Sequence, residues 1–506
     1  MEAISWLVTF AATLIFTYHI LYNRKLNLPP GPKPWPIIGN FNLIGPLPHL
    51  SIHNLSKKYG PLMMIHLGSV PVLIGSSVEM AELFLKTHDL AFAGRPKNAA
   101  GKYTTHDYSN ITWSQYGPYL RQARKLCMTE LFSAKRLDSF EYIRIEELNL
   151  MLKGVYEVEG KPLLVKDYLS NYSLNVISRM VLGNTYVDDK EGKSIIKSKE
   201  FKGMLDELFL LNGVFNLGDW IPFLKYVDVQ GYVKRMKILG KKLDGFMEHV
   251  LDEHNDRKDK EKGNWVPKDM VDLLLQLGGD PTIQIELDRK RIKGFIQDLI
   301  TGGTESSAIT VEWAMTELLR NPDIMDKAVE ELDCVIGKEK WVQEKDLQNL
   351  PYIWAIIKET LRLHPSGPFL VPHMSREHVN INGYDIPKGT LVFVNTYTIQ
   401  RDPKVYDRPE EFQPDRFIGK NIDITGLHFE LLPFGSGRRM CPGYNLGIKV
   451  ICSSLANLLQ GFTWKLPNDM KPKDLDMEEK FGISIPKKNP LIACAEPRHP
   501  HHLYNV

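Results

Sequence analysis

A turn that combines several glycines, two arginines and one cysteine constrains this chain more than any other segment. Residues 433–443 have the sequence PFGSGRRMCPG, and an apolar stretch with helical spacing, 444–462, follows at once. Helix N-termini and neighbouring guanidinium groups favour an ionised sulfur, so Cys441 is predicted to be a thiolate. The glycines let the backbone approach a flat ligand closely, and a thiolate is a ligand that can hold haem iron.

This turn resembles the haem-binding pattern of the cytochrome P450 superfamily, Phe-x-x-Gly-x-Arg-x-Cys-x-Gly. The fixed positions of the pattern are matched by Phe434, Gly437, Arg439, Cys441 and Gly443. The resemblance implies haem b as the cofactor, with Cys441 as the axial ligand of the iron and Phe434 beside it. It also implies the fold of that family, which is mainly α: a large helical domain with small β-sheets behind a single N-terminal transmembrane helix.

The composition argues against several other classes of protein. A net charge of +2 over 506 residues does not suggest a nucleic-acid partner. The five cysteines are scattered and lack CxxC spacing, so neither a disulfide framework nor a zinc site is indicated. A nicotinamide-binding fold would need Gly-x-Gly-x-x-Gly after a strand, but Met440 stands where the third glycine belongs. Length alone allows either several domains or one large one.

The N-terminus carries a candidate membrane anchor. The segment 3–22 is almost entirely apolar and is long enough to cross a bilayer core of about 30 Å. A cleaved signal peptide is the alternative, but the residues before the segment include Glu2 and no lysine or arginine. Because Arg24 and Lys25 follow the segment, the body of the protein is expected in the cytosol. We therefore predict an uncleaved anchor at 1–22, and the resemblance implies that the membrane is that of the endoplasmic reticulum.

A proline-rich segment separates this anchor from the rest of the chain. Residues 28–36 have the sequence LPPGPKPWP, which fits neither a helix nor a central strand and is expected to form a stiff spacer. This predicts a hinge at 23–40 and a catalytic domain at 41–506. Within that domain apolar residues at helical spacing dominate, so we expect mainly helix. The β-like stretches are few and short: 62–66, 70–74 and 391–395.

One long helix, over 291–319, is predicted to run through the core, and its middle breaks the apolar pattern. The sequence there is TGGTESS, with Gly302, Gly303, Glu305 and Ser306 in the interruption. Each interior glycine costs a helix about 1 kcal/mol relative to alanine, so a packing notch explains the glycines as well as a ligand does. In the functional interpretation the glycines make room for the cofactor and the two polar side chains relay protons.

The resemblance favours the functional interpretation. The superfamily carries Ala/Gly-Gly-x-Asp/Glu-Thr-Thr/Ser on a central helix over the haem, and residues 302–307 align with that pattern. One position departs, because the usual threonine is Ser306 here. Serine keeps the hydroxyl for cleavage of the O–O bond but lacks the methyl group that restricts the rotamer. The resemblance therefore implies proton delivery by Glu305 and Ser306.

Two further motifs match the family. Glu359 and Arg362 share one helical face at i,i+3, which alone is a weak signal. The family joins its Glu-x-x-Arg to the arginine of a later segment, which here is Arg416 in FQPDRF. The resemblance implies that the three side chains form a buried structural network near the cysteine turn.

Three cations match the contacts that the family makes to the haem propionates: Arg124, His373 and Arg439. Cations can pair with carboxylates that enter a site of low dielectric. Two positions depart from the common pattern, since Leu120 replaces the tryptophan of Trp-x-x-x-Arg and His373 stands where many plant relatives have arginine. The basic residues around Arg124 are also compatible with a solvated face, and the family docks its acidic reductase on the cysteine side.

The substrate pocket is placed only by analogy with the family. The side chains that would form an apolar, partly aromatic wall are Phe215, Phe369, Leu370, Phe481 and Ile483. Ordinary core packing explains any one of them equally well.

The order of the motifs resembles plant A-type microsomal members. This implies electrons from NADPH through cytochrome P450 reductase, with cytochrome b5 as a further donor, and insertion of one oxygen atom from O2 into a small hydrophobic metabolite. We predict an aromatic substrate of the phenylpropanoid, lignan or flavonoid type. The alternatives are a terpenoid or sterol hydroxylase, or a haem-thiolate isomerase that does not use O2 conventionally.

Overall fold

The computed structural model describes residues 26–185, 198–261, 264–281, 283 and 285–504. The predicted anchor at 1–22 lies outside these residues. Within the described ranges, no helix has both the length and the hydropathy that a transmembrane span requires.

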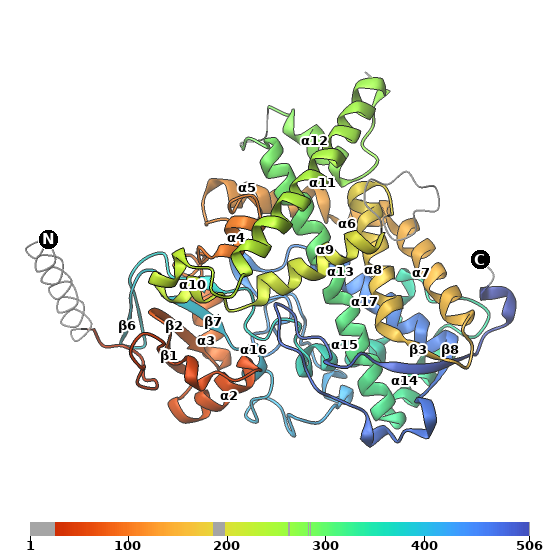
Figure 1. Cartoon of the computed structure of the whole chain (residues 1–506). Helices are drawn as coiled ribbons and strands as arrows, with labels where there is room; N and C mark the ends of the chain where they lie inside the picture. Colours follow the sequence, from red (N-terminus) through yellow and green to blue (C-terminus); the bar gives the residue numbers. More distant parts are fainter. Residues whose placement is uncertain (1–25, 186–197, 262–263, 282, 284, 505–506) are drawn as a thin grey trace, which may run out of the picture.

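The helix α13 (Arg289–Arg320) crosses the centre of the molecule, where the sequence predicts it (Figure 1). It begins at Asp288, whose side chain accepts a hydrogen bond from the Arg291 amide and so caps the helix. It ends just before Pro322, which starts the next helix. Three long helices pack against α13: α8 (Val165–Leu182), α15 (Pro351–Leu363) and α17 (Tyr444–Gly461).

The other helices surround this centre. They are α2 (Pro48–Tyr59), α3 (Val78–Glu82), α4 (Ala99–Thr104), α5 (Pro118–Leu126), α6 (Ala134–Ser139), α7 (Glu141–Tyr156), α9 (Ser198–Gly213), α10 (Leu217–Trp220), α11 (Tyr232–Glu261), α12 (Met270–Gly278), α14 (Pro322–Val335) and α16 (Thr396–Ile399). Short helical turns are η1 (Phe41–Leu43), η2 (Leu83–Thr87), η3 (Cys127–Leu131), η4 (Pro222–Tyr226), η6 (Glu344–Asn349), η7 (Pro414–Phe417), η8 (Gly437–Arg439), η9 (Pro467–Asp469), η10 (Pro472–Asp474) and η11 (His501–Tyr504).

Small sheets lie beside the helical body, as the sequence predicts. The largest has the order β1-β2-β7-β4, from β1 (Leu62–Leu67), β2 (Val70–Gly75), β7 (Leu391–Val394) and β4 (His373–Met374). β1 and β2 form an antiparallel hairpin, and β7 pairs in parallel with β2. The other sheets are β3-β9-β8, from β3 (Pro162–Leu164), β9 (Ile492–Pro497) and β8 (Phe462–Lys465), and β5-β6, from β5 (Val379–Ile381) and β6 (Tyr384–Ile386).

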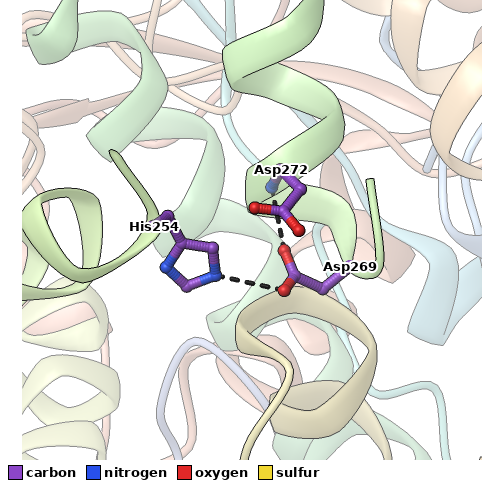
Figure 2. A group of neighbouring side chains, drawn as sticks. All are labelled: His254, Asp269 and Asp272. Carbon is purple, nitrogen blue, oxygen red and sulfur yellow. Dashed lines mark hydrogen bonds and ion pairs between the residues drawn. The ribbon is translucent and has the colours of Figure 1, made fainter. Parts of the chain in front are cut away.

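A buried charge network joins α11 to the start of α12 (Figure 2). His254 Nδ1 lies 2.6 Å from the Val250 carbonyl, and its Nε2 lies 3.1 Å from Asp269 Oδ2. Both partners are acceptors, so the ring satisfies them only as the doubly protonated imidazolium. Burial lowers the pKa of His254, but the hydrogen bond and charge of Asp269 outweigh it and hold this pKa above its usual value.

The same cluster has the spacing of a metal site, but cations of the chain already fill it. The ligand atoms of His254, Asp269 and Asp272 lie within 4.8 Å of one another. Arg257 Nη2 lies 2.9 Å from the Asp269 carboxylate and 2.5 Å from that of Asp272. One guanidinium and one imidazolium therefore balance the two carboxylates, and we interpret the cluster as a brace between the helices.

Candidate active site

A cavity of about 370 Å³ lies between α13 and the cysteine turn. Gly302 and Ser306 of α13 line one side, and Phe434 and Cys441 line the other. Ile177 of α8 closes part of the edge. The cavity therefore has two opposed walls, and one of them carries the Cys441 thiol. Such a space suits a flat ligand that the sulfur binds on one face.

The conformation of the cysteine turn explains its glycines. Gly435 and Gly437 have φ values of 69° and 67°, in the left-handed region that side chains disfavour. A Cβ on Gly437 would also lie 2.1 Å from the Leu85 carbonyl oxygen. The turn is closed by a hydrogen bond of 2.9 Å from the Cys441 amide to the Phe434 carbonyl. These contacts fix the backbone so that the sulfur faces the cavity.

The surroundings of the sulfur have opposing effects on its ionisation. Burial raises the pKa of the Cys441 thiol, while the Gly443 amide, which donates to the sulfur, and the charge of Arg124 act to lower it. The remaining exposure of this side chain is to the cavity. A positively charged iron at that position would supply the charge that stabilises the thiolate.

Four basic side chains line one edge of the cavity: Arg95, Arg124, His373 and Arg439. Within the described residues they bond backbone carbonyls, and none of them forms an ion pair. Arg124 Nη2 donates to Met440 O at 2.7 Å, and Arg439 Nη2 donates to Ser114 O at 2.6 Å. His373 Nδ1 lies 2.9 Å from Phe92 O, so the ring donates there.

Burial and the crowding of like charges both disfavour the charged forms of these side chains. Burial and the neighbouring Arg124 lower the pKa of Arg439 to about 9, and burial together with the charges of Arg439 and Arg124 holds the pKa of Arg95 well below its usual value. Burial and the charge of Arg95 hold the pKa of His373 well below its usual range. An excess of buried cations beside a cavity is the complement of a ligand with carboxylates, so the edge fits the two propionates of haem.

Arg95 is a candidate haem contact that the sequence analysis missed. It lies in the stretch FAGRP, where it belongs to none of the motifs that we recognised. Its guanidinium bonds the carbonyls of Thr112, Val371 and Pro372 at 2.8–3.0 Å. Thr112 is far in the sequence from Val371 and Pro372. Only the fold brings their carbonyls together around Arg95 and places this side chain at the cavity.

Residues 29–493 match the family model for cytochrome P450. The chain belongs to the cytochrome P450 family of monooxygenases. This P450 is 46% identical to "Trimethyltridecatetraene synthase" of Zea mays, over 95% of this chain and 90% of the maize protein. It is 41% identical to "3,9-dihydroxypterocarpan 6A-monooxygenase" of Glycine max, over 97% of both chains. "Flavonoid 3'-monooxygenase" of Petunia hybrida is 38% identical over 98% of both.

A solved zebra fish cytochrome P450, with abiraterone, has the same fold. The two structures superpose with a TM-score of 0.75, over 90% of this chain and all of the zebra fish chain, at 24% sequence identity. The mainly helical architecture with small sheets, predicted from the sequence, is therefore confirmed.

The two glycines of the central helix serve different purposes in this P450. A Cβ on Gly303 would lie 2.7 Å from Ile177 Cγ1 on α8, so this glycine is a packing notch between two helices. A Cβ on Gly302 would meet no atom within 4 Å, so this position opens on the cavity. Both glycines line the cavity, so the packing interpretation applies to Gly303 in addition to the ligand interpretation, whereas Gly302 leaves open space only.

The two residues of the predicted acid–alcohol pair point in different directions. Ser306 lines the cavity, and its Oγ donates to the Gly302 carbonyl at 3.0 Å. Glu305 does not line the cavity: its Oε1 lies 3.5 Å from Lys166 Nζ, and its Oε2 accepts from Ser484 Oγ at 3.3 Å. Both contacts of Glu305 are long, so its carboxylate is held loosely, away from the cavity.

The five predicted pocket residues divide into two groups. Leu370 and Ile483 line the cavity. Phe215, Phe369 and Phe481 are absent from its lining and pack in an aromatic cluster beside the large sheet, where Phe215 stacks on Phe481 at 5.9 Å. Leu370 has φ 55°, an unfavourable value for leucine, and the chain holds it there with its side chain at the cavity.

The predicted charge network lies between α15 and η7. Glu359 accepts from Arg362 Nε and Nη2 at 2.7 and 2.8 Å and from Arg416 Nε at 3.0 Å. The side chains of Glu359 and Arg362 have no exposed surface. Arg362 Nη1 also bonds the carbonyls of Gln400 and Pro409. The network thus ties α15 to the segment that leads to the cysteine turn.

Proposed function

We propose that this P450 uses NADPH and O2 to insert one oxygen atom into a small hydrophobic plant metabolite, while the other oxygen atom leaves as water. The observation that carries the proposal is the opposition, across one cavity, of the Cys441 thiol and the open face of α13 at Gly302 and Ser306. Haem bound there would supply the chemistry that activates oxygen.

The residues of the chain have separate roles in this proposal. Cys441 holds the iron, and the cations Arg95, Arg124 and Arg439 bind the propionates together with His373. Gly302 leaves space for oxygen beside the helix. The Ser306 hydroxyl carries a proton at the cavity wall, where its present acceptor is the Gly302 carbonyl.

The reductase supplies two electrons for each oxygen atom inserted, and its docking is proposed on the cysteine side. Exposed cations on α5 and α6, among them Arg121, Lys125 and Lys135, support an acidic partner on this face. Raising the salt concentration should therefore slow reduction of this P450 by the reductase.

The test is reconstitution of the full chain with NADPH–cytochrome P450 reductase in membranes. We expect substrate-dependent consumption of NADPH and one labelled oxygen atom in the product under isotope-labelled O2. Conversion that proceeds without NADPH and O2 would contradict the proposal and favour the isomerase alternative.

For the substrate, we propose an aromatic phenylpropanoid, lignan or flavonoid type. The support comes from relatives whose names specify flavonoid and pterocarpan monooxygenases, at 38% and 41% identity over nearly the whole chain. A terpenoid is the second candidate, since the relative at 46% identity is named a trimethyltridecatetraene synthase. Several side chains that line the cavity are aliphatic, which also favours a terpenoid substrate: Leu299, Leu370, Val371 and Ile483.

A binding titration separates these two candidates. A flavanone and an acyclic terpene alcohol are added in turn to the purified protein, and the shift of the haem Soret band is measured. The aromatic proposal expects a saturable shift with the flavanone at lower concentration; the reverse order favours the terpenoid.

We also propose that residues 1–22 anchor the protein in the endoplasmic reticulum membrane with the catalytic domain in the cytosol. The apolar segment and the flanking Arg24 and Lys25 support this orientation. Protease added to intact microsomes should digest the domain, and mass spectrometry should recover the uncleaved N-terminus. A protected domain would contradict the orientation.

A further inference from the structure

One carboxylate on α13, Asp298, binds a short irregular segment beside the cavity. Its Oδ1 accepts from Asn110 Nδ2 at 2.7 Å and from Thr112 Oγ1 at 3.0 Å. Its Oδ2 accepts from the amides of Ile111 at 2.6 Å and Thr112 at 3.0 Å. Asp298, Ile111 and Thr112 all line the cavity. The proposed reaction assigns no role to any of them.

The opposite side of the same segment bonds the cations of the cavity edge. Arg95 Nε donates to Thr112 O at 3.0 Å, and Arg439 donates to Ile111 O at 3.3 Å and to Ser114 O at 2.6 Å. The amides of the segment thus face an anion, and its carbonyls face cations. Such charge-assisted hydrogen bonds are stronger than those between neutral groups.

These external bonds largely determine where the segment lies. Residues 105–116 form no regular helix or strand, so the backbone groups must find partners elsewhere. A local bond from the Trp113 amide to Asn110 Oδ1, at 3.1 Å, closes one turn but does not attach the segment to the body of the protein. The segment also packs closely against Gly294 of the central helix, but its hydrogen bonds from residues 110–112 to that helix go to Asp298.

We propose that Asp298 is a positioning residue that holds residues 110–114 as one wall of the substrate cavity and thereby sets which ligands fit. A direct role in binding a cationic substrate does not suit it, because its four hydrogen bonds occupy the usual acceptor positions of both oxygens. Burial raises its pKa to about 6, against the effect of these bonds, and its remaining exposure is to the cavity.

The inference rests on the proposed function only through the assumption that substrate occupies this cavity, and its test does not require turnover. Asp298→Asn keeps the shape of the side chain but replaces one acceptor oxygen by a donor, which opposes the donors of the segment. The matched control is Glu312→Gln on the same helix. Glu312 is a buried carboxylate that also accepts one backbone amide, from Leu491 at 2.9 Å, but it is not part of the cavity lining.

The experiment uses the full chain with bound haem and two probes, imidazole and 4-phenylimidazole, whose binding shifts the Soret band. Imidazole is small and requires only access to the iron in order to bind. The phenyl ring of 4-phenylimidazole must also fit against the cavity wall that residues 110–114 form. In Asp298→Asn we expect the Kd of 4-phenylimidazole to rise by about tenfold or more, with the Kd of imidazole within about twofold of the wild type. Hydrogen exchange of the peptide that contains residues 110–114 should accelerate. Glu312→Gln should change neither the ratio of the two Kd values nor this exchange.

An unchanged ratio of the two Kd values, or unchanged exchange in the segment, would overturn the proposal. If Asp298→Asn fails to bind haem, Thr112→Val replaces it: this variant removes only the hydroxyl donor to Oδ1 and should shift the ratio in the same direction by a smaller factor, and no shift again overturns the proposal. A wild-type protein that shows these probe effects but no NADPH-dependent turnover would contradict the proposed function and leave this inference standing.

Discussion

The charge of Glu359 should be essential to the stability of this P450. Glu359 accepts four hydrogen bonds: two from Arg362, one from Arg416 and one from the Gln413 amide at 2.7 Å. In Glu359→Gln the new amide donor faces guanidinium donors, and the charge that balances the fully buried Arg362 is lost. The carbonyls that also bond Arg362 solvate it only in part.

The expected magnitude follows from this burial. Removing one partner of a buried ion pair typically costs about 3–5 kcal/mol, because the other charge stays buried without compensation. Folded proteins are stable by only about 5–15 kcal/mol, so this single substitution should remove a large fraction of the total.

The assay is urea unfolding of the full chain in detergent, followed by far-UV circular dichroism and by the reduced-CO absorption band of thiolate-ligated haem. The control is Glu82→Gln. Its partner Lys86 lies 2.7 Å away in an i,i+4 pair, but both side chains are exposed, at 45% and 66%, so the loss should stay below about 0.5 kcal/mol. Adding Arg362→Met to Glu359→Gln should restore part of the stability, because the unpaired cation is then removed.

A Glu359→Gln variant within about 1 kcal/mol of the wild type, with its CO band intact, would refute the reasoning. A double variant no more stable than the single one would show instead that the lost hydrogen bonds matter and the buried charge does not.

Three other outcomes are expected. Cys441→Ser should abolish the reduced-CO band while Cys452→Ser, a buried cysteine of α17, keeps it; the opposite result would reassign the ligand. Ser306→Ala should slow product formation by about 10²–10⁴-fold and raise the peroxide released per NADPH, whereas Ser306→Thr should keep or improve coupling; unchanged turnover and peroxide in the alanine variant would remove this hydroxyl from the mechanism. His254→Gln should lower the Tm at about pH 6, and because the folded pKa of His254 is raised, the difference from the wild type should shrink as pH rises through that pKa; a constant difference would contradict the imidazolium.

The sequence predicts those parts of the structure whose conformation is determined by residues close by in the chain. The glycines of the cysteine turn meet a conformational demand within a few residues, since Gly435 and Gly437 adopt positive φ. The short strands β1, β2 and β7 follow from β-like runs that end at turns, and α13 follows from its apolar period. For these elements the neighbouring residues contain the reason for the conformation.

The direction in which a side chain points has no such local cause. Phe215, Phe369 and Phe481 are apolar whether they face a ligand or one another, and hydrophobicity alone does not distinguish a cavity wall from a core. Glu305 illustrates the same point on a helix, because adjacent residues are separated by about 100° around the axis. The motif therefore names Glu305 and Ser306 together, while the fold turns one toward Lys166 and the other toward the cavity.

Contacts between charged groups that lie far apart in the sequence become visible only in the folded structure. Asp298 and its partners are separated by 186–188 residues, and Arg95 meets Arg439 only because η8 returns beside the segment after η2. Neither side chain stands out in the sequence, since a single aspartate or arginine usually lies on a solvated surface. In the structure both become informative for the same reason: a charge enclosed beside a cavity must be balanced by something. Backbone amides balance Asp298, so its role is to hold the wall, whereas the three arginines at the cavity edge have no carboxylate partner among the described residues, so their role is to bind an anion.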